Sequence, residues 1–275
     1  MDKLQQIRHL ALDLDGTLYL GTRLLSGTRR LLDLLPQLGI GRTFLTNNSS
    51  RSTAQYMEHL AALGIDAKRT DFYSSVQATL DYLRTERPEL QCLYVLGTPA
   101  LREEFAAAGY RLADDHKLEP EAVVVGFDTT LSYDRLCQTA YWISRGKLFV
   151  ATHPDRVCPT DKPTLLPDCG AICSLLTSAT GREPDVVLGK PHPQMLKGVL
   201  ARHGLTPAQL AIVGDRLYTD MQLAQASGAL GILVLSGETT RRHLAASPLK
   251  PDLVVRDVNE LADLLQAGRD GRSAG

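Results

Sequence analysis

Short apolar runs alternate along the chain with longer stretches in which apolar residues recur at helical spacing. The runs predict strands over His9–Asp13, Arg42–Thr46, Gln91–Leu96, Ala122–Val125, Lys147–Ala151, Leu210–Gly214 and Leu230–Leu235, and the spacing predicts helices over Gly27–Leu38, Ser52–Leu63, Leu101–Ala108, Asp134–Arg145 and Thr219–Ser227. Ser26 is expected to cap the first helix, because a serine hydroxyl accepts hydrogen bonds from free N–H groups of a first turn. The alternation is typical of parallel βαβ units, so it predicts an α/β fold with a doubly wound, Rossmann-like parallel sheet.

The middle of the chain repeats this alternation with enough strands and helices for a core of its own. We therefore expect residues 1–77 and 187–275 to form one Rossmann-like core, and residues 78–186 to form an inserted α/β domain. The irregular stretch Thr152–Cys169 lies within the insertion, and loops of this length are usually functional.

Composition narrows the class of protein. The 275 residues can bury a sizeable core, and the formal net charge of -1 gives no basic field that would favour nucleic acid or an acidic membrane. No apolar run approaches the roughly 20 residues of a membrane-spanning helix, and the first residues lack the apolar centre of a signal peptide. We expect a cytoplasmic protein without nucleic-acid or membrane partners, in which the five cysteines are buried reduced thiols.

Three polar clusters each follow the end of a predicted strand. They read DLDGT at 13–17, TNNS at 46–49 and GDRLYTD at 214–220. Because the carboxyl ends of parallel strands line one crevice where ligands bind, we expect the clusters to meet in one site. Each cluster alone is also typical of a turn or a helix cap, so the argument depends on their joint occurrence.

The acids of these clusters point to phosphoryl transfer. Asp13 and Asp15 lie two residues apart on an extended segment and so face one side, and Asp215 adds a third carboxylate. Such carboxylates repel one another, and a bound Mg²⁺ would remove the conflict and screen the charge of a phosphate. We therefore expect Asp13 to attack phosphorus, and Asp15 to protonate the leaving alcohol and then activate water.

Donors for the phosphate oxygens are also present. Thr46 and Asn47 supply hydroxyl and amide groups, and a helix expected to begin near Ser50 would add backbone N–H groups. Lys190, in a Gly-Lys-Pro segment, supplies a cation that would damp the charge developing in transfer. The sequence thus predicts Mg²⁺-dependent hydrolysis of a small-molecule phosphate monoester through an aspartyl-phosphate on Asp13.

The segments DLDGTL, LTNNS, GKP and GDRLYTD resemble the ordered motifs of the haloacid dehalogenase superfamily of phosphohydrolases. TNNSS, VVVGFD, ATHPD and GREPDVVLGKPHP are similar to its NagD-like or p-nitrophenyl phosphatase branch, subfamily IIA. That branch carries an α/β cap of the C2 type between the second and third motifs. It usually has Asn where His153 stands in ATHPD, so His153 is expected either to face the site or to be a structural loop residue.

The resemblance implies particular roles. The implied set is Asp13 as nucleophile, Asp15 as acid and base, Mg²⁺ held by the Asp13 and Asp215 side chains and the Asp15 carbonyl, phosphate held by Thr46, Asn47 and Lys190, and Asp220 and Asn48 as supporting residues. The cap is expected to set the substrate through the stretch Asp155–Ile172, and a homodimer formed through the cap is compatible with the resemblance.

Two alternatives remain open from the residues. A phosphomutase would use the same chemistry but return the phosphoryl group to its substrate. A receiver-type signalling module also clusters acids around Mg²⁺ at strand ends. The inserted domain and Asp15, which is placed for turnover, argue against the receiver.

Overall fold

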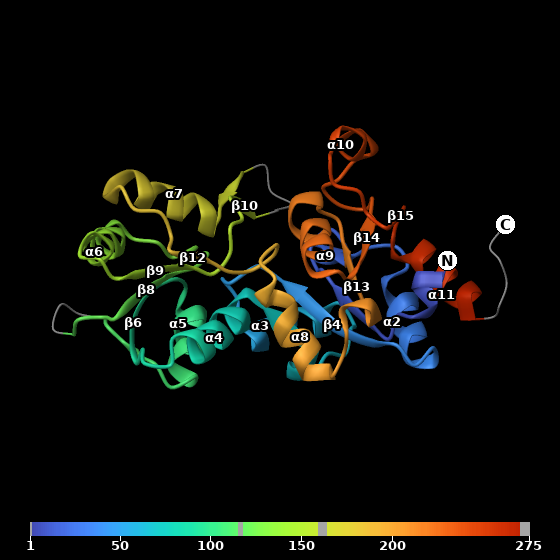
Figure 1. Ribbon diagram of the computed structural model, residues 1–275, viewed down its shortest axis with the longest axis horizontal. Coiled ribbons are helices and arrows are strands. Elements are labelled where there is room, and N and C mark those ends of the chain that lie inside the picture. Colours follow the sequence, from blue (N-terminus) through green and yellow to red (C-terminus); the bar gives the residue numbers. More distant parts are fainter. Residues whose placement is uncertain (1, 115–117, 159–163, 270–275) are drawn as a thin grey trace. The chain divides into compact units, whose positions relative to one another are not determined.

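The computed structural model describes residues 2–114, 118–158 and 164–269 (Figure 1). The chain forms two compact units. The first unit comprises Met1–Thr46, Met57–Tyr73 and Leu196–Gly275, and the second comprises Asn47–Tyr56 and Ser74–Met195. The second unit thus takes in residues 47–56, 74–77 and 187–195 in addition to the range 78–186 of the sequence-based expectation.

A parallel sheet organises the first unit, with strand order β15-β14-β13-β1-β4-β5. Its strands are β1 (His9–Leu12), β4 (Gly41–Thr46), β5 (Phe72–Ser74), β13 (Leu210–Gly214), β14 (Leu230–Val234) and β15 (Leu253–Val255). β1 pairs in parallel with β4 and β13, and Leu12 aligns with both Phe44 and Val213. The three central strands therefore end at the same edge of the sheet, which confirms the predicted α/β fold.

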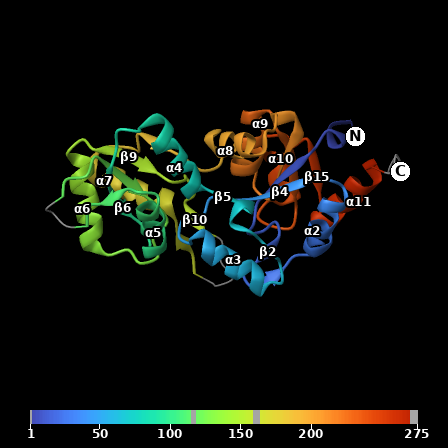
Figure 2. The same cartoon turned by 90° about the horizontal axis from the view of Figure 1, so that it is seen from below.

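Helices cover both faces of this sheet. They are α1 (Asp2–Gln5), α2 (Thr28–Gln37), α3 (Thr53–Ala62), α8 (Gln194–His203), α9 (Gln222–Ser227), α10 (Arg241–Ala246) and α11 (Val258–Arg269), and a small antiparallel pair, β2 (Tyr19–Leu20) and β3 (Arg23–Leu24), follows β1. Figure 2 shows α8 and α9 on one side of the sheet and α2 and α11 on the other. Every residue of β1 is buried, which explains its uninterrupted apolar run.

The expected cap at Ser26 is wrong by one residue. Gly27 occupies the N-cap position of α2 with φ +80°, and no side chain caps the helix. A Cβ at this position would overlap the backbone of Asn259 in α11, so the close approach of α2 and α11 requires glycine here.

The second unit has its own parallel sheet, with strand order β12-β9-β8-β6-β7. Its strands are β6 (Cys92–Leu96), β7 (Arg111–Leu112), β8 (Ala122–Val125), β9 (Leu148–Ala151) and β12 (Val186–Val187), and its helices are α4 (Ser75–Glu86), α5 (Pro99–Ala107), α6 (Tyr133–Ser144) and α7 (Cys169–Thr180). Alternate residues of β6 enter different cores. Tyr94 and Leu96 pack with Trp142 of α6, whereas Val95 packs with Phe105 of α5.

The irregular stretch expected after β9 contains a short hairpin, β10 (Val157–Cys158) and β11 (Leu166–Pro167). Residues 159–163 belong to the stretch expected to set specificity, and they lie outside the described residues. The expectation of buried thiols is wrong for Cys137, which is exposed on α6, and Cys158 is half-buried. Cys92, Cys169 and Cys173 are buried as expected, because they belong to the apolar core of the second unit.

Among the described residues, no helix combines the length and the apolar character that crossing a membrane would require.

Candidate active site

The first two acids follow β1 directly. The N–H of Asp13 donates to the carbonyl of Val213 (2.8 Å), so the parallel pairing with β13 continues to this residue. Thr17 Oγ1 donates to Asp13 Oδ2 (3.4 Å), and the Tyr19 hydroxyl donates to Asp15 Oδ2 (3.4 Å). Both carboxylates are half-buried at the carboxyl edge of the sheet, as the sequence predicted, and hydroxyl groups of their own loop orient them.

Asp215 comes directly after β13 and is 2 % exposed. The N–H of Glu238 donates to its Oδ2 (2.6 Å). Gly16, which has φ +85°, lies so close that a Cβ there would be 2.5 Å from the same oxygen. The loop after β1 and the loop after β14 therefore enclose this carboxylate.

Asp220 is fully buried in a π-helical turn, Leu217–Met221, where a regular helix was expected from Thr219. The regular helix α9 begins only at Gln222. The N–H of Arg216 donates to Asp220 Oδ2 (3.2 Å), so the wider turn holds the carboxylate near the end of β13. Single π turns inside helices are frequent at functional sites.

Three carboxylates converge in the first unit. Asp13, Asp215 and Asp220 each offer an oxygen, and these oxygens lie within 4.8 Å of one another. Burial, and after it the neighbouring charges of Asp13 and Asp220, together raise the pKa of Asp215 to about 7. Asp215 Oδ1 is buried and has no hydrogen-bond partner among the described residues.

This group fits a hard divalent cation. A buried carboxylate oxygen without a donor, surrounded by like charge, is stabilised by a cation with oxygen-ligand preference such as Mg²⁺. Asp13 and Asp215 were expected as side-chain ligands, and both belong to the group. The side chain of Asp15 is not part of the group, and its backbone carbonyl as a ligand stays a prediction. Asp220, expected only as a supporting residue, is a member of the group.

The expected phosphate-binding residues divide between the units. Thr46 is the buried last residue of β4 in the first unit. In the second unit, the side-chain amide of Asn47 pairs with the backbone of Lys190. The N–H of Lys190 donates to Asn47 Oδ1 (2.6 Å), and Asn47 Nδ2 donates to the Lys190 carbonyl (2.9 Å). The two residues, 143 positions apart in sequence, are thus fixed against each other.

The helix expected to begin near Ser50 begins at Thr53 instead. Asn48 Oδ1 accepts from the N–H and the hydroxyl of Ser50 (2.9 and 2.7 Å), which forms a turn in place of helix. Ser52 then caps α3, because its hydroxyl accepts from the N–H of Gln55 (3.2 Å). Asn48 therefore shapes the loop, and its Nδ2 also donates to the sulfur of Cys158 (3.7 Å).

Sequence reasoning missed two contributors from the loop after β14. Glu238 gives Asp215 its backbone donor, and Ser236 Oγ donates to the carbonyl of Gly16 (2.9 Å). Both follow the carboxyl end of a predicted strand, and the rule that selected the other clusters could have selected the segment SGE at 236–238.

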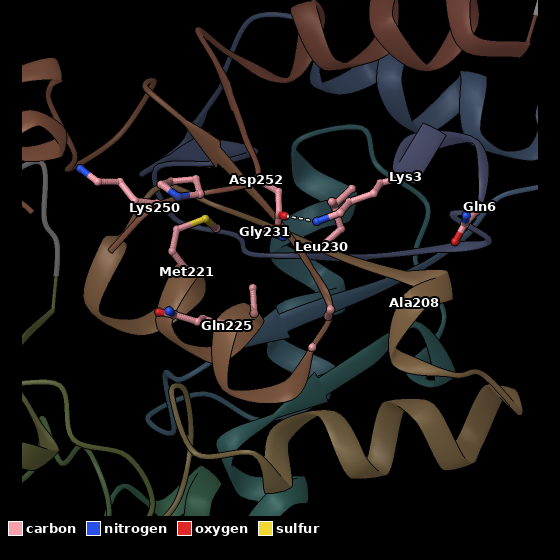
Figure 3. A pocket seen from close by; sticks show the side chains of 13 residues that line it. Lys3, Gln6, Ala208, Met221, Gln225, Leu230, Gly231, Lys250 and Asp252 are labelled. Carbon is pink, nitrogen blue, oxygen red and sulfur yellow. Dashed lines mark hydrogen bonds and ion pairs between the residues drawn. The ribbon is translucent and has the colours of Figure 1, made fainter. Parts of the chain in front are cut away.

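A pocket of about 380 Å³ in the first unit is a separate feature (Figure 3). Lys3 and Asp252 pair across it (2.7 Å), and the first residues of β14, Leu230 and Gly231, line it. These residues lie at the amino ends of the strands, whereas Asp13 and Asp215 lie at the carboxyl ends. The pocket is therefore at the opposite edge of the sheet from the carboxylates.

Comparison with known proteins agrees with this geometry. Residues 10–111 match the family described as haloacid dehalogenase-like hydrolase, and residues 187–261 match a second family of HAD-like hydrolases. The chain is 32% identical to an acid sugar phosphatase of Staphylococcus aureus over 257 residues, which cover 94% of this chain and 97% of that one. The chain therefore belongs to the haloacid dehalogenase-like hydrolases.

Solved structures narrow the family to a branch. A 4-nitrophenylphosphatase from Thermotoga maritima superimposes with a TM-score of 0.91 at 38% identity, covering 96% of this chain and 99% of that chain. A glycerol phosphate phosphatase from Mycobacterium tuberculosis, solved in complex with magnesium, has a TM-score of 0.86 at 32% identity. The match covers 96% of this chain and 79% of that chain. The chain is a phosphatase of the NagD and p-nitrophenyl phosphatase branch, which confirms the resemblance drawn from the motifs.

Proposed function

We propose that this phosphatase hydrolyses small phosphate monoesters by transferring the phosphoryl group to the carboxylate of Asp13. The observation that carries the proposal is the grouping of Asp13 with Asp215 and Asp220 at the carboxyl edge of a parallel sheet. A carboxylate held beside two others is activated only when a cation offsets their charge, and such a cation also screens an incoming phosphate.

The reaction divides into two displacements at phosphorus. In the first, an oxygen of Asp13 forms a bond to phosphorus while the bond to the ester oxygen breaks, and Asp15 gives its proton to the departing alkoxide. In the second, Asp15 takes a proton from water, the water oxygen bonds to phosphorus, and the carboxylate of Asp13 leaves. The proton that Asp15 gave is thus recovered in the second step, and the enzyme returns to its starting state.

Further side chains are assigned to the phosphate and the metal. Thr46, Asn47 and Lys190 are proposed to bind the phosphate oxygens, and the fixed pairing of Asn47 with the Lys190 backbone supports a positional role. Mg²⁺ bound by Asp13, Asp215 and the Asp15 carbonyl would supply charge neutralisation at the transferring group. Asp220 is proposed as a supporting acid beside that metal.

The substrate class follows from the relatives. Their names include an acid sugar phosphatase and a glycerol phosphate phosphatase, which favours small polyol or sugar phosphates as substrates of this chain too. We propose that residues 78–186 of the second unit act as the cap that selects among them. A cytoplasmic location and a homodimer formed through the cap stay predictions, and sedimentation of the purified chain would check the homodimer.

A panel of phosphate monoesters assayed with Mg²⁺ and with EDTA tests the proposal. We expect release of inorganic phosphate only with the metal, and a loss of roughly 10³-fold or more in Asp13→Asn, which keeps the shape of the side chain but removes its charge. Comparable turnover by Asp13→Asn would contradict the assignment. Return of the phosphoryl group to another position of the substrate, without release of phosphate, would indicate a phosphomutase.

A further inference from the structure

His153 is fully buried in the second unit, two residues after β9. Its two ring nitrogens face different carboxylates. Nδ1 lies 3.8 Å from Asp155 Oδ2, and Nε2 lies 3.5 Å from Asp168 Oδ1. Ser49 Oγ also lies 3.2 Å from Nε2. Asp155 is 9 % exposed and Asp168 3 %, so the histidine is placed between two nearly buried acids.

These three side chains could also be considered as ligands of a metal ion, since each offers a ligand atom within 4.8 Å of the others. The arrangement around the ring argues against this. One ion binds only one nitrogen of an imidazole, yet Asp155 and Asp168 face opposite nitrogens. The ring therefore lies between the two carboxylates, with Nδ1 beyond hydrogen-bond distance of Asp155 Oδ2 and Nε2 nearer to Asp168 Oδ1. The contact between His153 and Asp155 is thus one of packing and of facing polar groups in a buried cluster.

Asp155 connects this cluster to the residues assigned to phosphate. Asp155 Oδ1 accepts from Asn47 Nδ2 (3.1 Å). The same Nδ2 donates to the Lys190 carbonyl, and Asn47 Oδ1 accepts from the Lys190 N–H. Both N–H donors of the Asn47 amide are therefore engaged, and a rotation of Asp155 would remove the acceptor of one of them.

Packing couples the same residues. Gly189 has φ +74°, and a Cβ there would be 2.5 Å from His153 Cβ and 2.8 Å from Asn47 Oδ1. Asp168 is held in place because the same Oδ1 that faces His153 Nε2 also accepts from the N–H of Cys169 (2.6 Å) at the start of α7. Asp168 therefore anchors the histidine to a helix, while Asp155 is the member of the cluster that reaches Asn47.

We propose that His153 is a positioning residue that, through Asp155 and Asn47, fixes the backbone of Lys190 and so sets the affinity of the site for phosphate. This inference rests on the proposed function, because the assignment of Lys190 to phosphate belongs to it. The phosphoryl group is negatively charged both in the bound ester and in the transition state. A misplaced Lys190 therefore weakens the binding of the substrate and of the transition state alike. KM then rises more than kcat falls.

The test compares His153→Leu, which removes both ring nitrogens, with His153→Asn, which keeps a polar side chain with a donor. Hydrolysis of p-nitrophenyl phosphate and the dissociation constant of inorganic phosphate by calorimetry are measured with Mg²⁺. We expect His153→Leu to raise KM and the dissociation constant about 10-fold with kcat changed less than about 3-fold, and His153→Asn to restore both to within about 3-fold of the wild type.

Two further variants separate positioning from folding. Thr139→Val removes a buried hydrogen bond to the Arg135 carbonyl (2.7 Å) within α6, and it should leave KM unchanged at a comparable loss of thermal stability. If His153→Leu does not fold, Asp155→Asn provides the same comparison, because it removes the charge that faces Nδ1 but keeps an acceptor for Asn47. Asp155→Asn should raise KM in the wild type and have a much smaller effect in the His153→Asn background.

The outcomes are distinguishable from failure of the proposed function. In one outcome the wild type turns over esters, and His153→Leu and Asp155→Asn have the same KM and the same affinity for phosphate as the wild type. This outcome overturns the positioning role alone. In another outcome the wild type binds phosphate but does not turn over any ester, and the two variants bind phosphate more weakly. This outcome supports the positioning role and overturns the proposed reaction. A wild type that neither binds phosphate nor turns over any ester overturns both.

Discussion

At the scale of single residues, the strongest electrostatic conflict is at Asp215. Its carboxylate is almost fully buried beside Asp13 and Asp220, and burial together with these charges raises its pKa to about 7. A folded-state pKa above the value of the unfolded chain stabilises the fold at low pH, and this contribution is lost as the pH rises from about 4 to about 7. Without a cation, the site therefore costs stability at neutral and alkaline pH.

The variant Asp215→Asn should accordingly be more stable than the wild type in EDTA at pH 8, by on the order of 2 kcal/mol. It should also lose the rise in melting temperature that Mg²⁺ gives the wild type, because a carboxylate ligand is gone. Thermal unfolding with and without Mg²⁺ measures both effects. Asp252→Asn is the matched control, since its carboxylate pairs with Lys3 (2.7 Å) and its loss should not stabilise the fold. An Asp215→Asn protein with the full Mg²⁺ response would contradict this role.

His9 gives a second titration, far from the carboxylates. Burial, and after it the neighbouring His203, together lower the pKa of His9 to about 4. Thr43 Oγ1 lies 2.8 Å from His9 Nε2 and 3.3 Å from His203 Nε2, at the amino end of the sheet. In the unfolded chain the His9 imidazole binds a proton near pH 6.5, whereas in the folded chain it binds one only near pH 4. The free energy of unfolding therefore falls as the pH falls from about 6.5 to about 4.

We expect His9→Gln to flatten the decline of the melting temperature over this range. His243→Gln, at an exposed histidine of α10, should leave the decline as it is. Melting curves at half-unit intervals from pH 7 to pH 4.5 measure the difference. An unchanged slope in His9→Gln would show that other groups govern acid unfolding.

At the scale of elements, the strands were predictable because each is an apolar run, and the grouping of acids at one end of the sheet was predictable because the acids follow those strands. What the sequence could not provide is long-range pairing. The two hydrogen bonds between the Asn47 side chain and the Lys190 backbone join loops that only the folded second unit brings together. The start of α3 was missed for a local reason, since Asn48 forms a turn with Ser50 that competes with helix.

Two glycines of the second unit offer a matched test of the loop before Lys190. Gly189 and Gly181 have nearly equal left-handed φ values, +74° and +72°, so alanine strains the backbone equally at both. An added Cβ meets Asn47 and His153 at position 189 and nothing within 4 Å at position 181. Gly189→Ala should therefore raise KM for phosphate esters about 10-fold or more, whereas Gly181→Ala should lose only stability, about 1 kcal/mol. Equal KM values in the two variants would contradict the role of this loop.

At the scale of the whole molecule, the motifs indicated the family, and matches over most of the chain confirm it. Substrate choice could not be predicted in the same way. The proposed nucleophile and phosphate-binding residues would serve the part that all monoesters share, whereas recognition of the leaving group needs no fixed motif. The expected specificity stretch includes residues 159–163, outside the part that the structure describes. The selectivity of the second unit therefore stays a proposal.

The formation of a phosphoryl bond on Asp13 is the most direct test of the proposed reaction. The Asp15→Asn variant, which cannot activate water, is mixed with p-nitrophenyl phosphate and Mg²⁺, quenched in acid, and its peptides are mapped by mass spectrometry. We predict one phosphoryl group per chain on Asp13, sensitive to hydroxylamine and lost in the Asp13→Asn/Asp15→Asn double variant. Turnover without any covalent phosphate, or phosphate on a residue other than Asp13, would contradict nucleophilic attack by this carboxylate.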